Sequence, residues 1–183
     1  MSSRIPTPAT IDASPAASRP LLEEVKKHLG SAPNLFRVMA NSPAVLEGYL
    51  GLSGALAKGE LDARTRERIA LAVSELHRCD YCLSAHTYLA KSLAKLDEAE
   101  IAANREGGSG DPKADVAVRF AVRLARERGN VTDGDLKALR AAGYGDGQAL
   151  EILMHVVLTT LTNYVNHVAQ TEIDFPVVKH RSV

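Results

Sequence analysis

The sequence predicts an all-α protein. Past residue 20, apolar residues recur three or four positions apart, as they do along one face of a helix. We find no run in which β-branched and polar residues alternate, the pattern of a half-buried strand. Glycine and proline punctuate the chain at intervals typical of short helices. We therefore expect a single helical domain over residues 20–178, with a flexible N-terminal tail at 1–19 and a C-terminal tail at 179–183.

Capping residues set the expected bounds of each helix. Pro20 suits the first turn of the first helix, and Gly30 suits its end. Later helices begin at N-cap candidates, which are Ser42, Asp62, Asp97, Thr132 and Asp146. The expected elements are helices at 20–30, 42–59, 62–77, 80–93, 97–107, from 112, at 132–143 and at 147–171, with a turn at 34–39.

Length and charge exclude several classes of function. The chain has 183 residues, enough for one domain with a real core, and its 22 basic and 22 acidic residues balance. Balanced charge removes the long-range attraction that gathers proteins onto nucleic acid or anionic membranes. Most of the arginine group at 64, 66, 68 and 78 is interpreted as a solvated helix face. We expect no nucleic-acid partner.

Hydrophobic runs are too short for membrane insertion or export. No run of eighteen apolar residues occurs, so no segment is expected to span a bilayer. Residues 1–20 hold four of the eight prolines and lack the apolar stretch of a secretory signal. We expect a cytoplasmic protein.

The two cysteines form the most informative motif, because both lie in a single C-x-x-C, Cys79-Asp-Tyr-Cys82. A structural disulfide across so short a loop would remove little entropy from the unfolded chain. A zinc site could use Cys79, Cys82 and His86, but a second C-x-x-C or an H-x-x-x-H at zinc-finger spacing is missing. The third interpretation is a redox-active dithiol.

Helix geometry makes the redox interpretation concrete. At the start of a helix, free backbone N–H groups and the positive end of the helix dipole favour a thiolate. His86 lies one turn after Cys82, and helical side chains lean toward the N-terminus, so the imidazole is expected to point back at Cys82. Cys79 continues the same stripe. Such a site suits attack on a peroxide bond, followed by closure of a disulfide between Cys82 and Cys79.

The spacing of these residues resembles a known family. Glu67 stands twelve residues before Cys79, and Cys79-x-Tyr-Cys82-x-x-x-His86 follows. This pattern is similar to the alkylhydroperoxidase D (AhpD-like) branch of the carboxymuconolactone decarboxylase family. Supporting matches extend over about residues 30–178 and resemble the peroxidase-related subgroup; they include Asn34-Leu-Phe36, Pro43-x-x-Leu46, Asn163-Tyr-Val-Asn166-His167 and Asp174-Phe-Pro176.

The resemblance implies a role for each site residue. It makes Cys82 the peroxide-reacting cysteine, Cys79 the resolving one, His86 the base and Glu67 the outer member of a proton relay. The best-known members have His immediately before the second Cys, where this chain has Tyr81. A relay through that position is therefore not expected. The resemblance also implies a helical fold that assembles into trimers or hexamers.

A polar line marks the last predicted helix. His155, Thr159, Thr162 and Asn166 recur at helical spacing on an otherwise apolar segment. The line is expected either to border the cavity beside the dithiol or to form a hydrogen-bonded stripe that is buried or lies between subunits. The same two alternatives hold for Asn163 and His167.

These observations predict a thiol-dependent peroxidase that reduces alkyl hydroperoxides or hydrogen peroxide through a dithiol/disulfide cycle. We expect no cofactor and no resident metal. Its partner would be a dithiol electron donor, such as a lipoyl protein or a thioredoxin-like protein, and the chain would form a homo-oligomer. Two alternatives remain: a cofactor-free decarboxylase of the carboxymuconolactone type, and a dithiol redox sensor without turnover.

Overall fold

A computed structural model describes residues 3–181, and every regular element in that range is a helix. A short 3₁₀ turn, η1, precedes the first α-helix. The elements are η1 Ala16–Ser18, α1 Arg19–Leu29, α2 Asn34–Met39, α3 Pro43–Leu56, α4 Ala63–Leu76, α5 Asp80–Ser92, α6 Glu98–Arg105, α7 Pro112–Arg126, α8 Asp133–Ala141 and α9 Asp146–Ala169. The all-α prediction is confirmed.

Three predicted N-caps, Asp62, Asp97 and Thr132, bond to the first turn of α4, α6 and α8. The Asp62 carboxylate accepts the backbone N–H of Thr65 at the start of α4, and Thr132 forms a reciprocal capping box with Asp135 at α8. The prediction for α9 was wrong by one residue. Gly145 is its N-cap, and the side chain of Gln148 accepts the Gly145 N–H. The Gln148 side chain in the first turn thus caps the helix, which is the role that we expected of Asp146.

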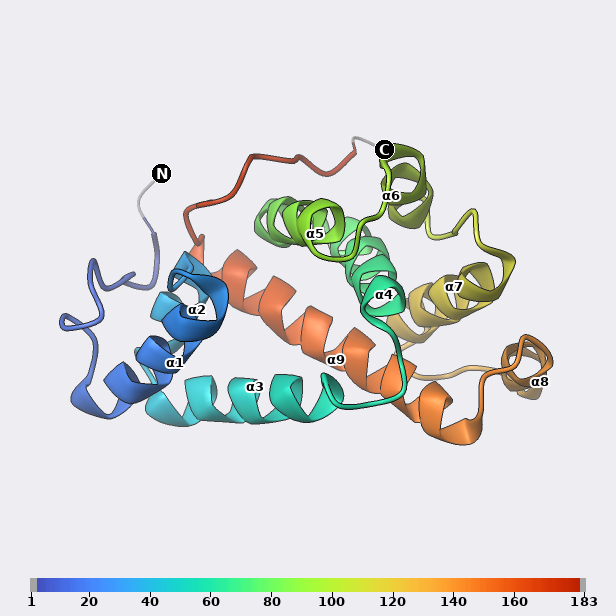
Figure 1. Ribbon diagram of the computed structural model, residues 1–183, viewed down its shortest axis with the longest axis horizontal. Coiled ribbons are helices and arrows are strands. Elements are labelled where there is room, and N and C mark those ends of the chain that lie inside the picture. The colour runs from blue at the N-terminus through green and yellow to red at the C-terminus, as the bar shows by residue number, and fades with distance from the viewer. Residues whose placement is uncertain (1–2, 182–183) are drawn as a thin grey trace.

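Helix α9 runs through the middle of the molecule and is flanked on both sides (Figure 1). α3, α4, α5 and α7 all contact it, and α4 also packs against α5, α6 and α7. The result is one body in which α4 and α9 bring segments distant in sequence together. No helix within residues 3–181 is long and apolar enough to cross a membrane.

Three apolar clusters hold the helices together, and the smallest joins α4, α5 and α6 around Leu71, Ala90 and Ile101. The first lies among α4, α7, α8 and α9, around the fully buried Ile69 and Ile152. The second lies among α1, α2, α3 and the start of α5, and it includes Leu46 together with Cys79 and Cys82. Because the dithiol is part of this second core, packing fixes the positions of both sulfur atoms.

Arg68 departs from the expectation that it faces solvent. The Arg68 side chain lies inside the protein, since the residue is 5% exposed, and its Nε lies 2.6 Å from Glu100 Oε1. A buried guanidinium needs such a partner. Burial raises the pKa of Glu100, but hydrogen bonds from Ser109, Asn104 and the backbone of Gly110, with the Arg68 contact, outweigh it and bring the value to about 2. The pair lies away from the cysteines and ties α4 to α6.

The segments expected as tails contact the helical domain where they are described. The Arg37 side chain donates to the carbonyl oxygens of Pro8 and Ala9, and the buried Ser18 hydroxyl donates to Ala40. At the other end, the segment after α9 passes from beside α2 across α5 toward α6 (Figure 1). Residues 1–2 and 182–183 lie outside the described range, and the predicted domain boundaries stay predictions.

Candidate active site

A tight connection places the dithiol at the start of α5. Helix α4 ends at Leu76, and Arg78 adopts a left-handed conformation with φ 55°. The Cys79 N–H then bonds to the Ser74 carbonyl oxygen at 3.0 Å. Cys79 itself is the N-cap of α5, and its sulfur accepts the Cys82 N–H at 3.4 Å. The prediction that the C-x-x-C opens a helix is confirmed.

Both cysteines are free thiols buried in the second core, each about 2% exposed. The Cys79 thiol donates to Cys82 and lowers its pKa. Burial acts in the opposite direction, but the charge of His86 and hydrogen bonds from the Asn163 and Asn166 side chains add to the lowering, and the Cys82 pKa falls to about 6. The same hydrogen bond and the burial raise the pKa of Cys79. Cys82 is therefore the thiolate of the pair near neutral pH.

His86 and Glu67 form an ion pair beside Cys82. His86 Nδ1 lies 2.9 Å from Glu67 Oε2, which joins α5 to α4. Burial alone would lower the pKa of His86, but the Glu67 carboxylate and the negative charge of Cys82 raise it. A positive imidazole and a thiolate thus stabilise each other, and Glu67 fixes the imidazole through Nδ1.

The polar line on α9 is buried, and its C-terminal half reaches the dithiol. Asn166 Nδ2 lies 3.2 Å from Cys82 Sγ, and the Cys82 thiol points at Thr162 Oγ1 from 3.9 Å. His155 lies further along the helix and is 8% exposed. Burial, followed by the charge of Arg66, lowers the His155 pKa to about 4. Of the four residues in this line, Thr162 and Asn166 contact Cys82.

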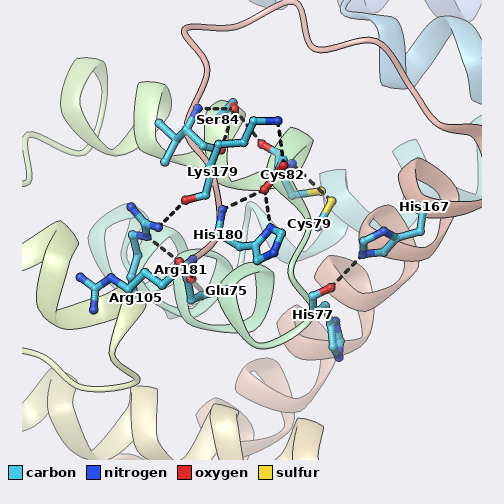
Figure 2. Close-up of polar contacts among 12 residues, drawn as sticks. Glu75, His77, Cys79, Cys82, Ser84, Arg105, His167, Lys179, His180 and Arg181 are labelled. Atoms are coloured by element: carbon cyan, nitrogen blue, oxygen red, sulfur yellow. Dashed lines mark hydrogen bonds and ion pairs between the residues drawn. The ribbon is translucent and has the colours of Figure 1, made fainter. Parts of the chain in front are cut away.

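Asn163 and His167 support the turn that carries Cys79. The Asn163 amide donates to Ser74 Oγ, and its oxygen lies 2.9 Å from His77 Nδ1. His167 Nε2 lies 2.8 Å from the His77 carbonyl oxygen. Figure 2 draws this contact as a dashed line. Both contacts brace the connection between α4 and α5, so these residues position the dithiol from behind.

No metal site accompanies the cysteines in the described part of the chain. Within residues 3–181, no three His, Cys, Asp or Glu side chains gather closely enough to hold a metal ion. Two surface hollows of about 630 and 640 Å³ lie elsewhere, one at α7 and α8 and one at α4 and α6. Neither is lined by the cysteines, His86 or Glu67.

Comparison with known proteins agrees with this arrangement. The family model described as "Carboxymuconolactone decarboxylase family" matches residues 43–127, a segment that contains Glu67, both cysteines and His86. A crystal structure titled as the alkylhydroperoxidase AhpD core, an uncharacterized peroxidase-related protein from Ralstonia eutropha JMP134, superposes with a TM-score of 0.84. It is 25% identical in sequence, and the match covers 94% of this chain and 92% of that one. Residues 43–127 thus match the carboxymuconolactone decarboxylase family, and the chain has the fold of the AhpD core.

Two further proteins are similar to this chain, one over part of its sequence and one in its fold. An uncharacterized protein of Haemophilus influenzae is 43% identical over 63 residues; the match covers 33% of this chain and 56% of that protein. The debrominase Bmp8, in complex with 2,3,4-tribromopyrrole, has a TM-score of 0.75 at 20% identity, with coverage of 95% and 93%. Solved structures with this AhpD-like fold include uncharacterized peroxidase-related proteins.

Tyr81, the departure from the best-known members of the carboxymuconolactone decarboxylase family, has a structural role. Its hydroxyl donates to Asp174 Oδ1 at 2.8 Å and accepts the Leu35 N–H at 3.0 Å. Burial raises its pKa. The ring packs edge-on against Phe175, with ring centroids 5.8 Å apart. Tyr81 thus joins α5 to α2 and to the segment after α9.

The C-terminal segment fastens the outer side of the same helix turn (Figure 2). Asp80 pairs with Lys179 at 3.0 Å and with His180 at 2.7 Å, and the Ser84 hydroxyl accepts the Val178 N–H. Burial raises the Asp80 pKa, but the hydrogen bonds from His180 and Lys179 outweigh it, and the net pKa is lowered. Sequence reasoning missed these contacts, since the segment carries no helical pattern.

Replacing Tyr81 with Phe is expected to lower the free energy of unfolding by about 1–3 kcal/mol, because it leaves the Leu35 N–H and an Asp174 oxygen unpaired. Equilibrium urea unfolding measures the change. Tyr88→Phe is the matched control, since Tyr88 is 49% exposed. Equal stability of the two variants would show that the Tyr81 hydroxyl contributes nothing.

Proposed function

We propose that the protein is a thiol-dependent peroxidase that reduces small alkyl hydroperoxides or hydrogen peroxide. The observation that carries the proposal is the environment of Cys82. Its thiolate is stabilised by the Cys79 thiol and the His86–Glu67 pair, and the second thiol lies one turn away on the same helix. Nucleophile, resolving thiol and proton carrier are thus present in one place.

The chemistry proceeds in two balanced steps. The Cys82 thiolate attacks the terminal oxygen of ROOH, so that an S–O bond forms while the O–O bond breaks. The leaving alkoxide takes a proton from the His86 imidazolium and departs as ROH. The Cys79 sulfur then attacks the sulfenic acid on Cys82, the S–S bond forms, and the hydroxyl leaves as water. Two thiols and one ROOH become one disulfide, one ROH and one water.

Renewed turnover needs two electrons from outside the site. A partner dithiol, lipoyl or thioredoxin-like, reduces the disulfide by thiol–disulfide exchange. Such a cycle belongs in a reducing compartment, which supports the cytoplasm as its location. Burial of both sulfurs supports small substrates, because a bulky one could not reach Cys82 without displacing core side chains.

Exposed apolar side chains on α9 support self-association. Leu150, Val157 and Tyr164 recur seven residues apart and are 65%, 45% and 58% exposed. Such a stripe on the longest helix is typical of a contact surface. A trimer or a hexamer is the expected assembly.

The assay measures hydroperoxide consumption with dihydrolipoamide, thioredoxin and glutathione as competing donors, and Cys82→Ser serves as the blank. Consumption sustained by a dithiol donor supports the proposal. One oxidation per subunit without cycling under any donor would instead indicate a redox sensor. Conversion of a muconolactone substrate by Cys82→Ser would indicate the decarboxylase.

The similarity in fold to the debrominase Bmp8 supports a second assay, for reductive debromination. A dithiol can also remove bromide reductively, since R–Br and two thiols give R–H, HBr and a disulfide. 2,3,4-Tribromopyrrole therefore replaces the hydroperoxide in a parallel reaction with the same donor. Bromide release faster than hydroperoxide consumption would contradict the peroxidase proposal.

Glu67→Gln is expected to slow hydroperoxide turnover by about 10- to 100-fold, the effect of losing a hydrogen bond to a charged partner. Glu67 raises the pKa of His86, so the high-pH limit of activity should also move to lower pH. Steady-state rates across pH measure both effects. Glu60→Gln, an exposed neighbour, is the control. An unchanged rate would remove Glu67 from the relay.

A further inference from the structure

Asn166 presents two different polar atoms near the reactive sulfur. Its Nδ2 donates to Cys82 Sγ at 3.2 Å. Its Oδ1 is buried and has no hydrogen-bond partner among the described residues. The residue as a whole is 5% exposed. A buried acceptor without a partner destabilises the fold, so its presence beside a nucleophile points to a ligand that satisfies it.

The amide orientation follows from the charge on the sulfur. A thiolate accepts hydrogen bonds, so the NH₂ group must be the one that bonds to Cys82, and the oxygen takes the neighbouring position on the same amide. Helix α9 keeps the Asn166 backbone in place, since the Asn166 main-chain carbonyl oxygen accepts the N–H groups of Gln170 and Thr171. Because the amide is planar and rigid, Oδ1 stays close to the sulfur whenever Nδ2 is bonded to it.

Thr162 completes the surroundings of the sulfur. Its hydroxyl donates to the Thr159 carbonyl oxygen at 2.9 Å, which leaves its oxygen free to accept the Cys82 S–H. Helix α9 therefore supplies an acceptor for the thiol form and a donor for the thiolate form. Thr162 and Asn166 are both uncharged, so neither adds a negative charge that would repel the thiolate.

We propose that Asn166 is a catalytic residue with two roles: its amide N–H holds the Cys82 thiolate, and its Oδ1 accepts the O–H of the bound hydroperoxide. The second role rests on the function proposed above. The hydrogen bond to Oδ1 holds the terminal oxygen of the hydroperoxide, which carries the hydrogen and is the atom attacked, next to Cys82 Sγ. The hydrogen stays on the oxygen as the S–O bond forms, so the same contact persists in the sulfenic acid.

This arrangement defines a class of substrate. The reacting oxygen must carry a hydrogen, as in hydrogen peroxide and alkyl hydroperoxides. A dialkyl peroxide has no such hydrogen and would leave Oδ1 unpaired. A buried acceptor that only the correct substrate can satisfy is a strong basis for discrimination.

The test separates the two roles with two reagents and two variants. Ultraviolet thiolate absorbance gives the titration midpoint of Cys82, with Cys82→Ser as the background. Rates are then measured at a pH above the midpoint of each variant. tert-Butyl hydroperoxide carries the O–H donor, whereas methyl methanethiosulfonate reacts with the same thiolate and has no donor. Several groups near Cys82 can titrate, namely Cys79, Tyr81 and His86 on α5, Glu67 on α4 and Tyr49 on α3.

Asn166→Ala should raise the titration midpoint and should slow the hydroperoxide about tenfold more than the thiosulfonate, the effect of one hydrogen bond. Asn166→Asp keeps an acceptor oxygen, removes the donor and adds a negative charge beside the sulfur, so its rate ratio is the informative readout and the midpoint is judged from Asn166→Ala. Asn166→Asp should raise the midpoint while the ratio of the two rates stays near that of the unaltered protein. Because Asp is nearly isosteric with Asn, this variant also serves if Asn166→Ala does not fold.

Asn104→Ala is the matched control. Asn104 is fully buried, and its Oδ1 also lacks a partner among the described residues, but its amide bonds to Glu100 on α6 and to Gly108 in the loop after α6, away from the sulfurs. It should lower stability and leave both the midpoint and the rate ratio unchanged. An unmoved midpoint in Asn166→Ala would overturn the thiolate role.

Equal slowing of the two reagents in Asn166→Ala would overturn the substrate role. Failure of the proposed function itself looks different. Unaltered protein that reacts with the thiosulfonate but not with the hydroperoxide would refute peroxidase activity, and the substrate role with it. The thiolate role would still be decided by the titration.

Discussion

Cys82→Ser is expected to abolish hydroperoxide consumption, because a serine hydroxyl cannot ionise where the Cys82 pKa is about 6. Cys79→Ser should behave differently. It keeps the attacking thiolate and loses only the resolving thiol, so the protein should consume one equivalent of hydroperoxide and then stop. Stopped-flow consumption with each reduced variant distinguishes the two, since one shows no burst and the other shows a burst without turnover.

The burial of both sulfurs makes this comparison clean. Each cysteine is about 2% exposed and packs in the same core, so Cys-to-Ser exchange changes the volume little in either case. Thermal unfolding of the two variants should therefore be similar. A burst retained in Cys82→Ser and lost in Cys79→Ser would reverse the roles assigned here.

His86→Gln is expected to lower the rate of hydroperoxide reduction by about 10²- to 10⁴-fold, the usual contribution of a positioned acid–base group. Glutamine can still bond to Glu67 but carries no charge and cannot supply a proton. The positive charge of His86 lowers the Cys82 pKa, so its loss should also move the thiolate midpoint above about 6. The matched control is His28→Gln, which removes a solvent-exposed imidazole from α1.

The pH profile gives this prediction a second readout. In the unaltered protein the rate should rise as Cys82 ionises through a pH of about 6 and fall again when His86 loses its proton, which happens above the ordinary imidazole pKa because Glu67 raises it. In His86→Gln the rising limb should shift to higher pH and the falling limb should vanish. A falling limb that persists would assign it to another group.

Local patterns predicted the centre of the site because its residues interact over short stretches of sequence. Cys79, Cys82 and His86 share one helix, so helical spacing alone places them together. Glu67 lies on the preceding helix, and its pairing with His86 was reached through the family resemblance. The structure confirms that contact at 2.9 Å.

The contribution of α9 could not be predicted in the same way. Asn166 and Thr162 meet Cys82 across more than 75 residues of sequence, and helical periodicity says nothing about which helix faces which. The sequence shows the polar line on α9. Whether that line borders the dithiol or forms a buried or intersubunit stripe depends on which helix packs against it, and the sequence does not give that packing. The same limit applies to Arg68, whose inward direction depends on Glu100 of another helix.

The segment after α9 carried the weakest signal of all. Residues 171–181 form no regular element, yet Asp174, Val178 and His180 fasten Tyr81, Ser84 and Asp80 in turn. Such contacts depend on single side chains and not on a repeating pattern. They explain why Tyr81 is compatible with this site, since its hydroxyl serves the packing of the segment and not the relay.

The site of the first oxidised sulfur tests the central claim most directly. Reduced Cys79→Ser is treated with one equivalent of tert-butyl hydroperoxide in the presence of dimedone, and the labelled peptide is identified by mass spectrometry. We predict a sulfenic acid adduct on Cys82. The same treatment of Cys82→Ser should leave Cys79 unlabelled, and a dimedone adduct on Cys79 would contradict the account.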